Sequence, residues 1–83
     1  MHYTYIIRSQ KDHKLYIGHT DNLKRRVTEH NAGLEQSTKN RRPFELIFYE
    51  AFKNQYDAIR RERYFKTDKG KSSLKQMLRE SLK

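Results

Sequence analysis

The segment Leu15–His30 constrains the fold most, because a strand pattern runs into a helix pattern within it. Lys14–His19 is rich in aromatic and β-branched residues, which favour a β-strand. Asn22 is of a type that begins helices and Gly33 of a type that ends them, so a helix over Asn22–Ala32 is predicted. We expect this helix to lie close to the strand that leads into it.

The preceding and following segments complete a small sheet. Tyr3–Arg8 is predicted to form a strand, joined to Lys14–His19 by the polar segment SQKDH, which is typical of a hairpin loop. Leu34–Arg42 has no apolar period and ends at the only proline, Pro43, which indicates a loop. Phe44–Phe52 is apolar on both alternating faces, as expected for a strand covered by helices on both sides.

Two further helices are predicted in the C-terminal part. Asn54 begins the first, which continues to about Thr67. Asp68–Lys71 is expected to interrupt the helical structure, and Ser73 with Gln76 forms a capping box for the last helix. The apolar residues of that helix recur at helical spacing, at Leu74, Met77, Leu78 and Leu82. The order β-β-α-β-α-α predicts an α/β fold of the α+β type, a three-stranded antiparallel sheet flanked by helices.

The charge of the chain points to a polyanionic partner. Nineteen Lys and Arg against ten Asp and Glu leave a net charge of +9 on 83 residues, which we expect to form a single domain over residues 1–83. Nucleic acid is the favoured partner, with simple solubility as the alternative. Without cysteine there is no disulfide or thiolate zinc site. No apolar run suits a membrane span or a signal peptide, so a cytoplasmic location without membrane contact is expected.

Three polar side chains are expected to face the interior. At about 100° per residue, Arg26 and His30 fall beside the buried stripe of the first helix and look toward the sheet. Glu62 lies within the apolar stripe of the second helix. A buried carboxylate is costly unless it meets a cation, a donor or a metal. Glu62 therefore either forms a salt bridge, to Arg26 or Arg63, or belongs to a functional site.

Two tyrosines add phenol groups to this set. If the hairpin pairs Tyr5 directly with Tyr16, both rings lie on one sheet face with Cβ atoms roughly 5 Å apart. A cross-strand pair that only packs is the alternative. Gly18 is expected on the same face, where it leaves room for a backbone or a ligand. Two phenols, a guanidinium, an imidazole and a carboxylate on one face would suit phosphoryl transfer.

Five segments of the chain, YTYI, LYIG, TDNLKRRVTEHN, NRRP and RRERYFK, resemble the small single-domain bacterial members of the GIY-YIG nuclease superfamily. The resemblance covers nearly the whole chain. It implies a metal-dependent endonuclease that hydrolyses nucleic-acid phosphodiester bonds, with one Mg²⁺ or Mn²⁺ ion. By motif, it implies that Tyr5, Tyr16, Arg26 and His30 are catalytic and that Glu62 binds the metal.

The roles that the resemblance implies follow ordinary phosphodiester chemistry. Tyr16 is our choice for the general base, and Tyr5 would orient the water or the base. Arg26 would offset charge on the phosphoryl oxygens, and His30 would hydrogen-bond a tyrosine or the phosphate. One carboxylate, Glu62, suffices for Mg²⁺, because waters and a substrate phosphate complete its octahedron.

The sequence also departs from the family pattern. Tyr3 stands where the first motif has glycine, and the segment TDKGKSSLKQML lacks the asparagine that many family nucleases carry after the glutamate. The missing asparagine favours the alternative function, a catalytically weak or inactive nucleic-acid-binding module on the same scaffold.

Affinity for nucleic acid is expected to come from contacts to phosphates, which carry no sequence information. Nothing in the chain resembles a base-reading module, so we expect selection of shape, strand ends or flaps, with DNA favoured over RNA, or delivery by a partner protein. The expected phosphate-binding residues are Lys24, Arg25, Lys39, Arg41, Arg42, Arg60, Arg61 and Lys66.

Overall fold

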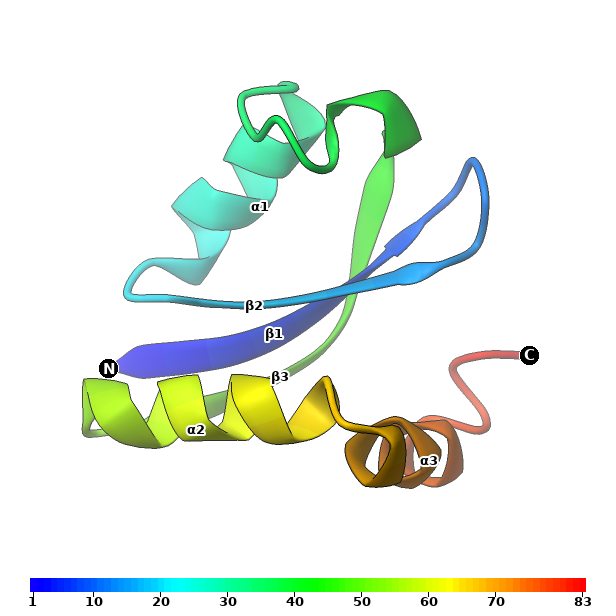
Figure 1. The fold of residues 1–83 in the computed structure, drawn as a ribbon. Coiled ribbons are helices and arrows are strands. Elements are labelled where there is room, and N and C mark those ends of the chain that lie inside the picture. Colours follow the sequence, from blue (N-terminus) through cyan, green and yellow to red (C-terminus); the bar gives the residue numbers. More distant parts are fainter.

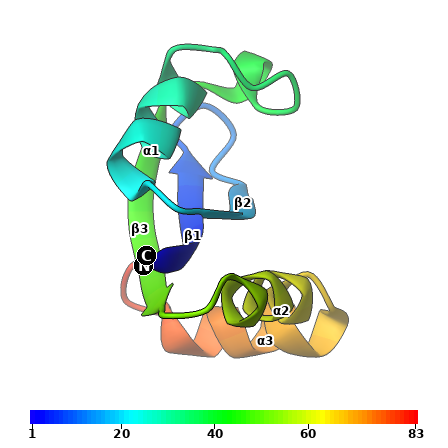
Figure 2. The ribbon, with the colours of Figure 1, turned by 90° about the vertical axis from the view of Figure 1, so that its left-hand side faces the viewer.

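A computed structural model describes all 83 residues and has the predicted order of strands and helices (Figure 1). The strands form one antiparallel sheet in the order β2-β1-β3. Helix α1 lies on one face of this sheet, and α2 and α3 lie on the other (Figures 1 and 2). The predicted fold class is therefore confirmed. The elements are β1 (His2–Ser9), β2 (Leu15–Thr20), α1 (Leu23–Asn31), the 3-10 turn η1 (Lys39–Arg41), β3 (Phe44–Phe52), α2 (Gln55–Phe65) and α3 (Asp68–Met77).

Strand β1 is central, and its alternating side chains enter two separate cores. Tyr5 and Ile7 pack with Phe44 on the α1 side. Ile6 packs with Phe65 on the α2 and α3 side. Successive side chains of a strand point to opposite faces, so one short strand supplies both cores.

Strand β3 forms one edge of the sheet, and a bulge lets its apolar residues serve both faces. The register shifts so that Ile6 pairs with Phe48 but Ile7 pairs with Leu46, which leaves Ile47 as the extra residue. Leu46 packs in the α1-side core, whereas Ile47 and Phe48 pack in the other core. The prediction that this strand is covered on both faces is confirmed.

The predicted interruption between helices at Asp68–Lys71 is wrong, because this segment is the first turn of α3. Thr67, not Ser73, caps the helix, and its hydroxyl oxygen accepts a hydrogen bond from the Gly70 N–H at 3.0 Å. A Cβ at Gly70 would lie 1.9 Å from the Tyr64 carbonyl oxygen. The glycine thus lets α3 begin directly against the end of α2, and this packing outweighs the low helix propensity of glycine.

The boundaries of α1 and α2 agree with the sequence analysis to within about two residues, but the end of α3 does not. Asn22 and Asn54 cap α1 and α2 through their side chains, as predicted. Helix α3 ends at Met77, so Leu82 lies beyond it, although Leu82 still packs against the core. None of the helices has the length and hydrophobicity needed to cross a membrane.

Candidate active site

Tyr5 and Tyr16 lie on the same sheet face but not opposite each other. The register pairs Tyr5 with Gly18 and Ile7 with Tyr16, so the predicted direct pairing is wrong. The two rings are diagonal neighbours with centroids 6.4 Å apart. A Cβ at position 18 would lie 2.5 Å from the Tyr5 hydroxyl oxygen. Gly18 is therefore needed to admit the Tyr5 ring, and the space it leaves is not open to a ligand.

His30 is completely buried and links two hydroxyl groups. Its Nε2 lies 2.8 Å from the Tyr5 hydroxyl oxygen, and its Nδ1 lies 2.8 Å from the Thr38 hydroxyl oxygen. Burial, together with the charge of Arg26, lowers the pKa of His30, so the imidazole is neutral at physiological pH. A neutral imidazole donates through one nitrogen and accepts through the other. Tyr5, His30 and Thr38 therefore form one continuous hydrogen-bonded chain.

The two tyrosines differ in their access to solvent. Tyr5 is 1% exposed, and burial raises its pKa to about 12, against the opposing influence of Arg26. A phenol with this pKa keeps its proton at neutral pH. Tyr16 is half-buried, and its ring lies edge-on to that of His30 with centroids 4.9 Å apart. Of the two, Tyr16 is the phenol that a water molecule can reach.

Arg26 lies at the edge of the same face and is held by two carboxylates. Its Nη1 lies 3.1 Å from Glu29 Oε1, and its Nη2 lies 2.5 Å from Glu35 Oε2. Burial alone would lower the pKa of Arg26, but the hydrogen bonds to Glu35 and Glu29 outweigh burial and raise it. The guanidinium is therefore always charged, and two carboxylates of the chain already offset that charge.

Glu62 approaches from the opposite side of the sheet, on α2. The predicted salt bridge to Arg26 or Arg63 is wrong, because the carboxylate contacts His19 Nδ1 and lies 2.6 Å from Lys66 Nζ. Burial would raise the pKa of Glu62, but Lys66 and His19 prevail and lower it, so Glu62 is ionised at neutral pH. The predicted convergence of five side chains over one face is thus corrected: Glu62 lies on the α2 side, where it contacts His19 of the edge strand β2.

Glu62 is the one of these residues that could hold a metal ion. The structure contains no group of three or more His, Cys, Asp or Glu side chains arranged for a metal. A single ionised carboxylate nevertheless suits Mg²⁺, which commonly keeps several waters and binds substrate phosphates. The Lys66 side chain is about half exposed, so its ammonium can turn away and free one carboxylate oxygen. The donor set fits one Mg²⁺ or Mn²⁺ ion bound together with substrate.

His19 is a site residue that the sequence analysis missed. It follows Gly18 in β2, so its side chain points to the α2 side of the sheet. There it contacts the Glu62 carboxylate. The alternation of the strand was the available signal, because it directs His19 away from the tyrosines and toward the helix that carries Glu62.

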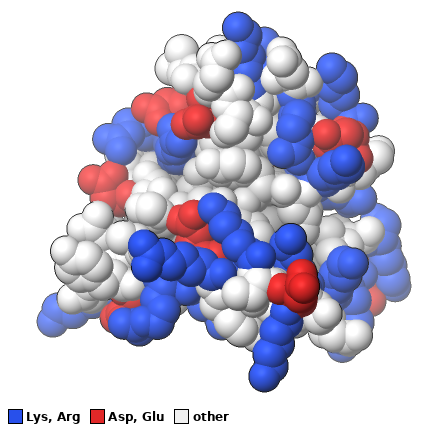
Figure 3. All heavy atoms as spheres, in the orientation of Figure 1, with Lys and Arg blue, Asp and Glu red and all other residues white.

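Most of the predicted phosphate-binding cations are engaged within the chain. Figure 3 shows the result on one face of the molecule, where acidic side chains lie among the basic ones. Lys24, Lys39 and Arg42 form no ion pair. The paired cations are Arg25 with Asp21, Arg41 with Asp12, Arg60 with Asp57, Arg61 with Glu50 and Lys66 with Glu62.

Comparisons with known proteins agree on one family. A family model described as the GIY-YIG catalytic domain matches residues 1–76. The chain is 43% identical over 75 residues to a UPF0213 protein of Staphylococcus haemolyticus, covering 89% of this chain and 90% of the relative. It is 46% identical over 69 residues to one from Pediococcus acidilactici, covering 77% and 68%.

A solved structure is also similar. The solution NMR structure of a UPF0213 protein from Bacillus halodurans superposes with a TM-score of 0.57 at 32% identity, covering 92% of this chain and 83% of that one. These relatives are therefore similar to this chain in sequence and in fold, and their names carry no information on activity.

Proposed function

The chain belongs to the GIY-YIG catalytic domain family, and we propose that it is a divalent-metal-dependent endonuclease that hydrolyses nucleic-acid phosphodiester bonds. The proposed substrate is DNA, selected by its structure during repair or nucleic-acid processing in the cytoplasm. The observation that carries the proposal is the buried chain from Tyr5 through His30 to Thr38, which supports the accessible Tyr16. A fully satisfied buried network holds its members in one arrangement, as a catalytic site requires.

Tyr16 is the group proposed to take the proton of the attacking water. It is the more accessible of the two phenols, and a general base must lie within reach of the water whose proton it takes. Tyr5 keeps its own proton and fixes His30, against whose ring the Tyr16 ring rests. In this arrangement Tyr5 and His30 orient the base.

Arg26 is proposed to bind a non-bridging oxygen of the scissile phosphate. Its guanidinium has more N–H donors than its two carboxylate partners occupy, so donors remain for a substrate. A planar fork of donors fits two phosphate oxygens, which an ammonium group does not. Charge that develops on the phosphoryl group would be stabilised by this contact.

Glu62 would hold the Mg²⁺ or Mn²⁺ ion. When bound, the ion supplies Lewis-acid polarisation of the phosphate and a more acidic water molecule. Lys66 serves as the counter-ion of Glu62 until then, and His19 keeps the carboxylate oriented from the other side. The half-buried position of Glu62 limits the directions in which its oxygens can point.

One observation favours the second candidate, a nucleic-acid-binding module without efficient catalysis. Both charged groups of the site already have partners within the protein: Arg26 contacts Glu29 and Glu35, and Glu62 contacts Lys66 and His19. A substrate must displace or share these partners. The absent asparagine after the glutamate points the same way. Such a module could be delivered to its substrate by a partner protein.

Glu62→Gln tests the proposed function. We expect the wild type to cleave at least one of branched, nicked, single-stranded and duplex DNA with Mg²⁺ or Mn²⁺, and the variant to cleave none while its affinity stays within a few fold. Glu50→Gln is the matched control, because Glu50 is also half-buried and paired to an arginine of α2, at 2.8 Å. Cleavage by Glu62→Gln at the wild-type rate would contradict the metal assignment. A folded wild type that cleaves none of these substrates would favour the binding module.

A further inference from the structure

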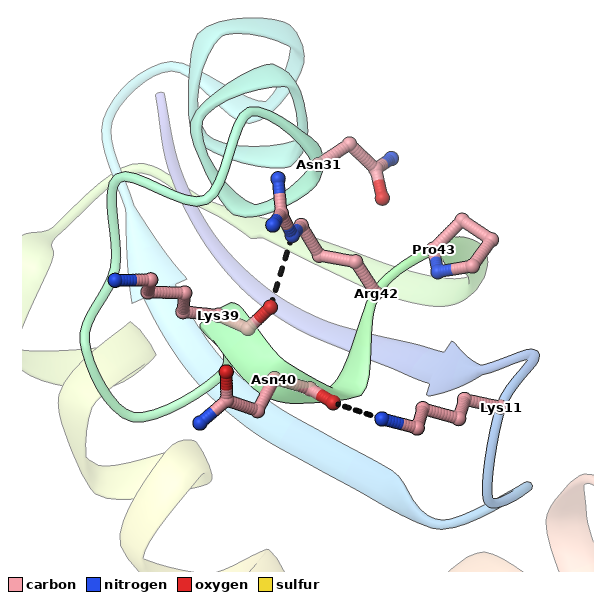
Figure 4. A pocket seen from close by; sticks show the side chains of 6 residues that line it. All are labelled: Lys11, Asn31, Lys39, Asn40, Arg42 and Pro43. Atoms are coloured by element: carbon pink, nitrogen blue, oxygen red, sulfur yellow. Dashed lines mark hydrogen bonds between the residues drawn. The ribbon is translucent and has the colours of Figure 1, made fainter.

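A strongly basic pocket lies between the β1–β2 turn, the end of α1 and the segment that leads into β3 (Figure 4). Its volume is about 380 Å³. The lining contains three cations and no carboxylate, whereas acidic and basic side chains are mixed over the face drawn in Figure 3. The lining residues are Lys11, Asn31, Lys39, Asn40, Arg42 and Pro43.

The cations of this pocket are not neutralised by the chain. Lys11 Nζ donates to the Asn40 carbonyl oxygen at 3.0 Å, and Arg42 Nε donates to the Lys39 carbonyl oxygen at 2.8 Å. The Lys39 ammonium has no hydrogen-bond partner, and none of the three cations forms an ion pair. Several like charges in one pocket repel one another, so an anion that binds there is favoured.

The pocket is held in shape before any ligand binds. The Ser9 hydroxyl donates to the Arg41 carbonyl oxygen at 2.6 Å, and Arg41 Nε lies 3.0 Å from an Asp12 oxygen. The Asn31 side chain accepts from the Phe44 N–H at 2.7 Å and donates to the Phe44 carbonyl oxygen at 3.1 Å. Because these contacts fix the segment between Arg41 and Phe44, binding needs little further ordering of the backbone.

Gly33 places the Arg42 guanidinium. Its φ of +78° suits glycine, and a Cβ at this position would lie 2.7 Å from Arg42 Nη1. The guanidinium therefore packs directly against the backbone that ends α1. In this position it lies between Asn31 and Lys39, as Figure 4 shows.

The pocket adjoins the candidate active site. Asn31 follows His30 in the chain and Lys39 follows Thr38, and His30 and Thr38 are the residues joined by the buried hydrogen bond. Neighbouring Cα atoms are about 3.8 Å apart. The lining of the pocket therefore borders the buried hydrogen-bonded chain that supports Tyr16.

We propose that Lys11, Lys39 and Arg42 together bind a single phosphate of the nucleic-acid strand, outside the cleavage position. The choice of nucleic acid as the source of the phosphate rests on the proposed function. The lining has no aromatic side chain on which a base could stack, so the contact is to the backbone and independent of sequence. The guanidinium supplies directed donors, and the two ammonium groups supply charge.

The salt dependence of binding tests this proposal. Fluorescence anisotropy with a short duplex DNA would compare the wild type with Lys39→Ala/Arg42→Ala over a salt series. Loss of one phosphate contact flattens the slope of log affinity against log salt by about 0.9. We expect that change in the double variant and no further change when Lys11→Ala is added. A change of about 1.8 or more, as for separately bound phosphates, or no change, would overturn the proposal.

Two controls make the result specific. Lys75→Ala/Arg79→Ala removes the same charge from the α3 region on the other face of the sheet and should leave the slope unchanged. Lys39→Ala removes a side chain with no partner in the fold, so its effect cannot come from a lost internal contact. Circular dichroism and thermal melting would check the folding of each variant.

Cleavage, assayed separately, distinguishes a failure of the pocket from a failure of the nuclease. Suppose that the wild type binds duplex DNA but never cleaves it, and that the double variant shows the expected flatter slope. This result would support the phosphate-binding pocket and contradict the nuclease function. Cleavage by the wild type, with equal slopes for wild type and double variant, would support the nuclease and overturn the pocket.

Discussion

The two faces of the sheet share the same central strand and each has an apolar core, but only the α1 face also buries a chain of hydrogen-bonded side chains. On the α2 and α3 side, Ile6 packs in a cluster of hydrocarbon and aromatic side chains that includes Phe65. On the α1 side, the neighbouring Tyr5 carries its hydroxyl to His30 and thence to Thr38. Apolar burial stabilises a fold at about 25 cal/mol per Å², whereas a buried polar network mainly fixes an arrangement. Stability is therefore expected to depend most on one face, and chemistry on the other.

The largest effect on stability is expected on the apolar face. Phe65 is fully buried, so Phe65→Ala should lower the free energy of unfolding by about 3–5 kcal/mol, a large share of the total for a domain of this size. Urea denaturation would measure it, with Phe65→Leu as a milder variant that still folds. Val27→Ala, on the half-buried edge of the other face, should cost clearly less. Equal losses would contradict the division between the faces.

Arg26→Ala should have the largest effect on catalysis among the residues of the α1 face. Its guanidinium is proposed to act on transition-state charge, so the cleavage rate should fall by about a hundredfold or more while affinity changes little. Arg26→Lys keeps the charge but loses the fork, and should recover only part of the rate. A folded Arg26→Ala protein that cleaves normally but binds DNA poorly would instead assign Arg26 to substrate binding.

Tyr5→Phe should affect stability and activity together, to a smaller extent. The change removes one hydroxyl and leaves His30 Nε2 buried without a partner, which costs about 1–3 kcal/mol. Cleavage should also fall, because His30 is then less firmly oriented beside Tyr16. Tyr49→Phe is the control, because Tyr49 is 53% exposed and its hydroxyl has no such partner. If Tyr5→Phe is as stable as the wild type, the hydrogen bonds among Tyr5, His30 and Thr38 do not act as one network.

The smallest expected effect is on the pH dependence of stability. Burial lowers the pKa of His30 below its ordinary 6.5, so in mild acid the unfolded chain binds a proton that the folded protein does not. The stability due to neutral His30 is complete above pH 6.5 and is lost as the pH falls below it, with a slope of up to about 1.4 kcal/mol per pH unit.

The pH effect would be measured by urea unfolding at a series of mildly acidic pH values, as the difference between the wild type and His30→Asn. Glu35 and Glu62 have pKa values lowered from 4.5 and titrate in stronger acid, so they do not overlap this range. If the difference in unfolding free energy between the wild type and His30→Asn does not change with pH, His30 has the same pKa in the folded and unfolded states, and the prediction is wrong.

Local pattern in the sequence determined the order of elements and much of the candidate site. The asparagines at positions 22 and 54 start their helices as predicted, because capping depends on a few neighbouring residues. The helical period placed Arg26 and His30 toward the sheet, where both interact with Tyr5, since side chains repeat every 3.6 residues whatever the surroundings. The family resemblance rests on motifs of the same local kind.

Tertiary structure decided the strand register, the partners of the charges and the start of the last helix. Register depends on the geometry of the hairpin turn, so spacing alone could not show that Tyr5 faces Gly18. The pairing of Glu62 with His19 depends on α2 crossing the edge of β2. Only the tertiary structure separates the pocket cations from Arg41. Arg41 pairs with Asp12, whereas Lys11, far away in sequence, lies in the pocket with Lys39 and Arg42. Gly70 continues a helix because two helices approach closely there, and contacts between distant segments outweigh a local propensity of about 1 kcal/mol.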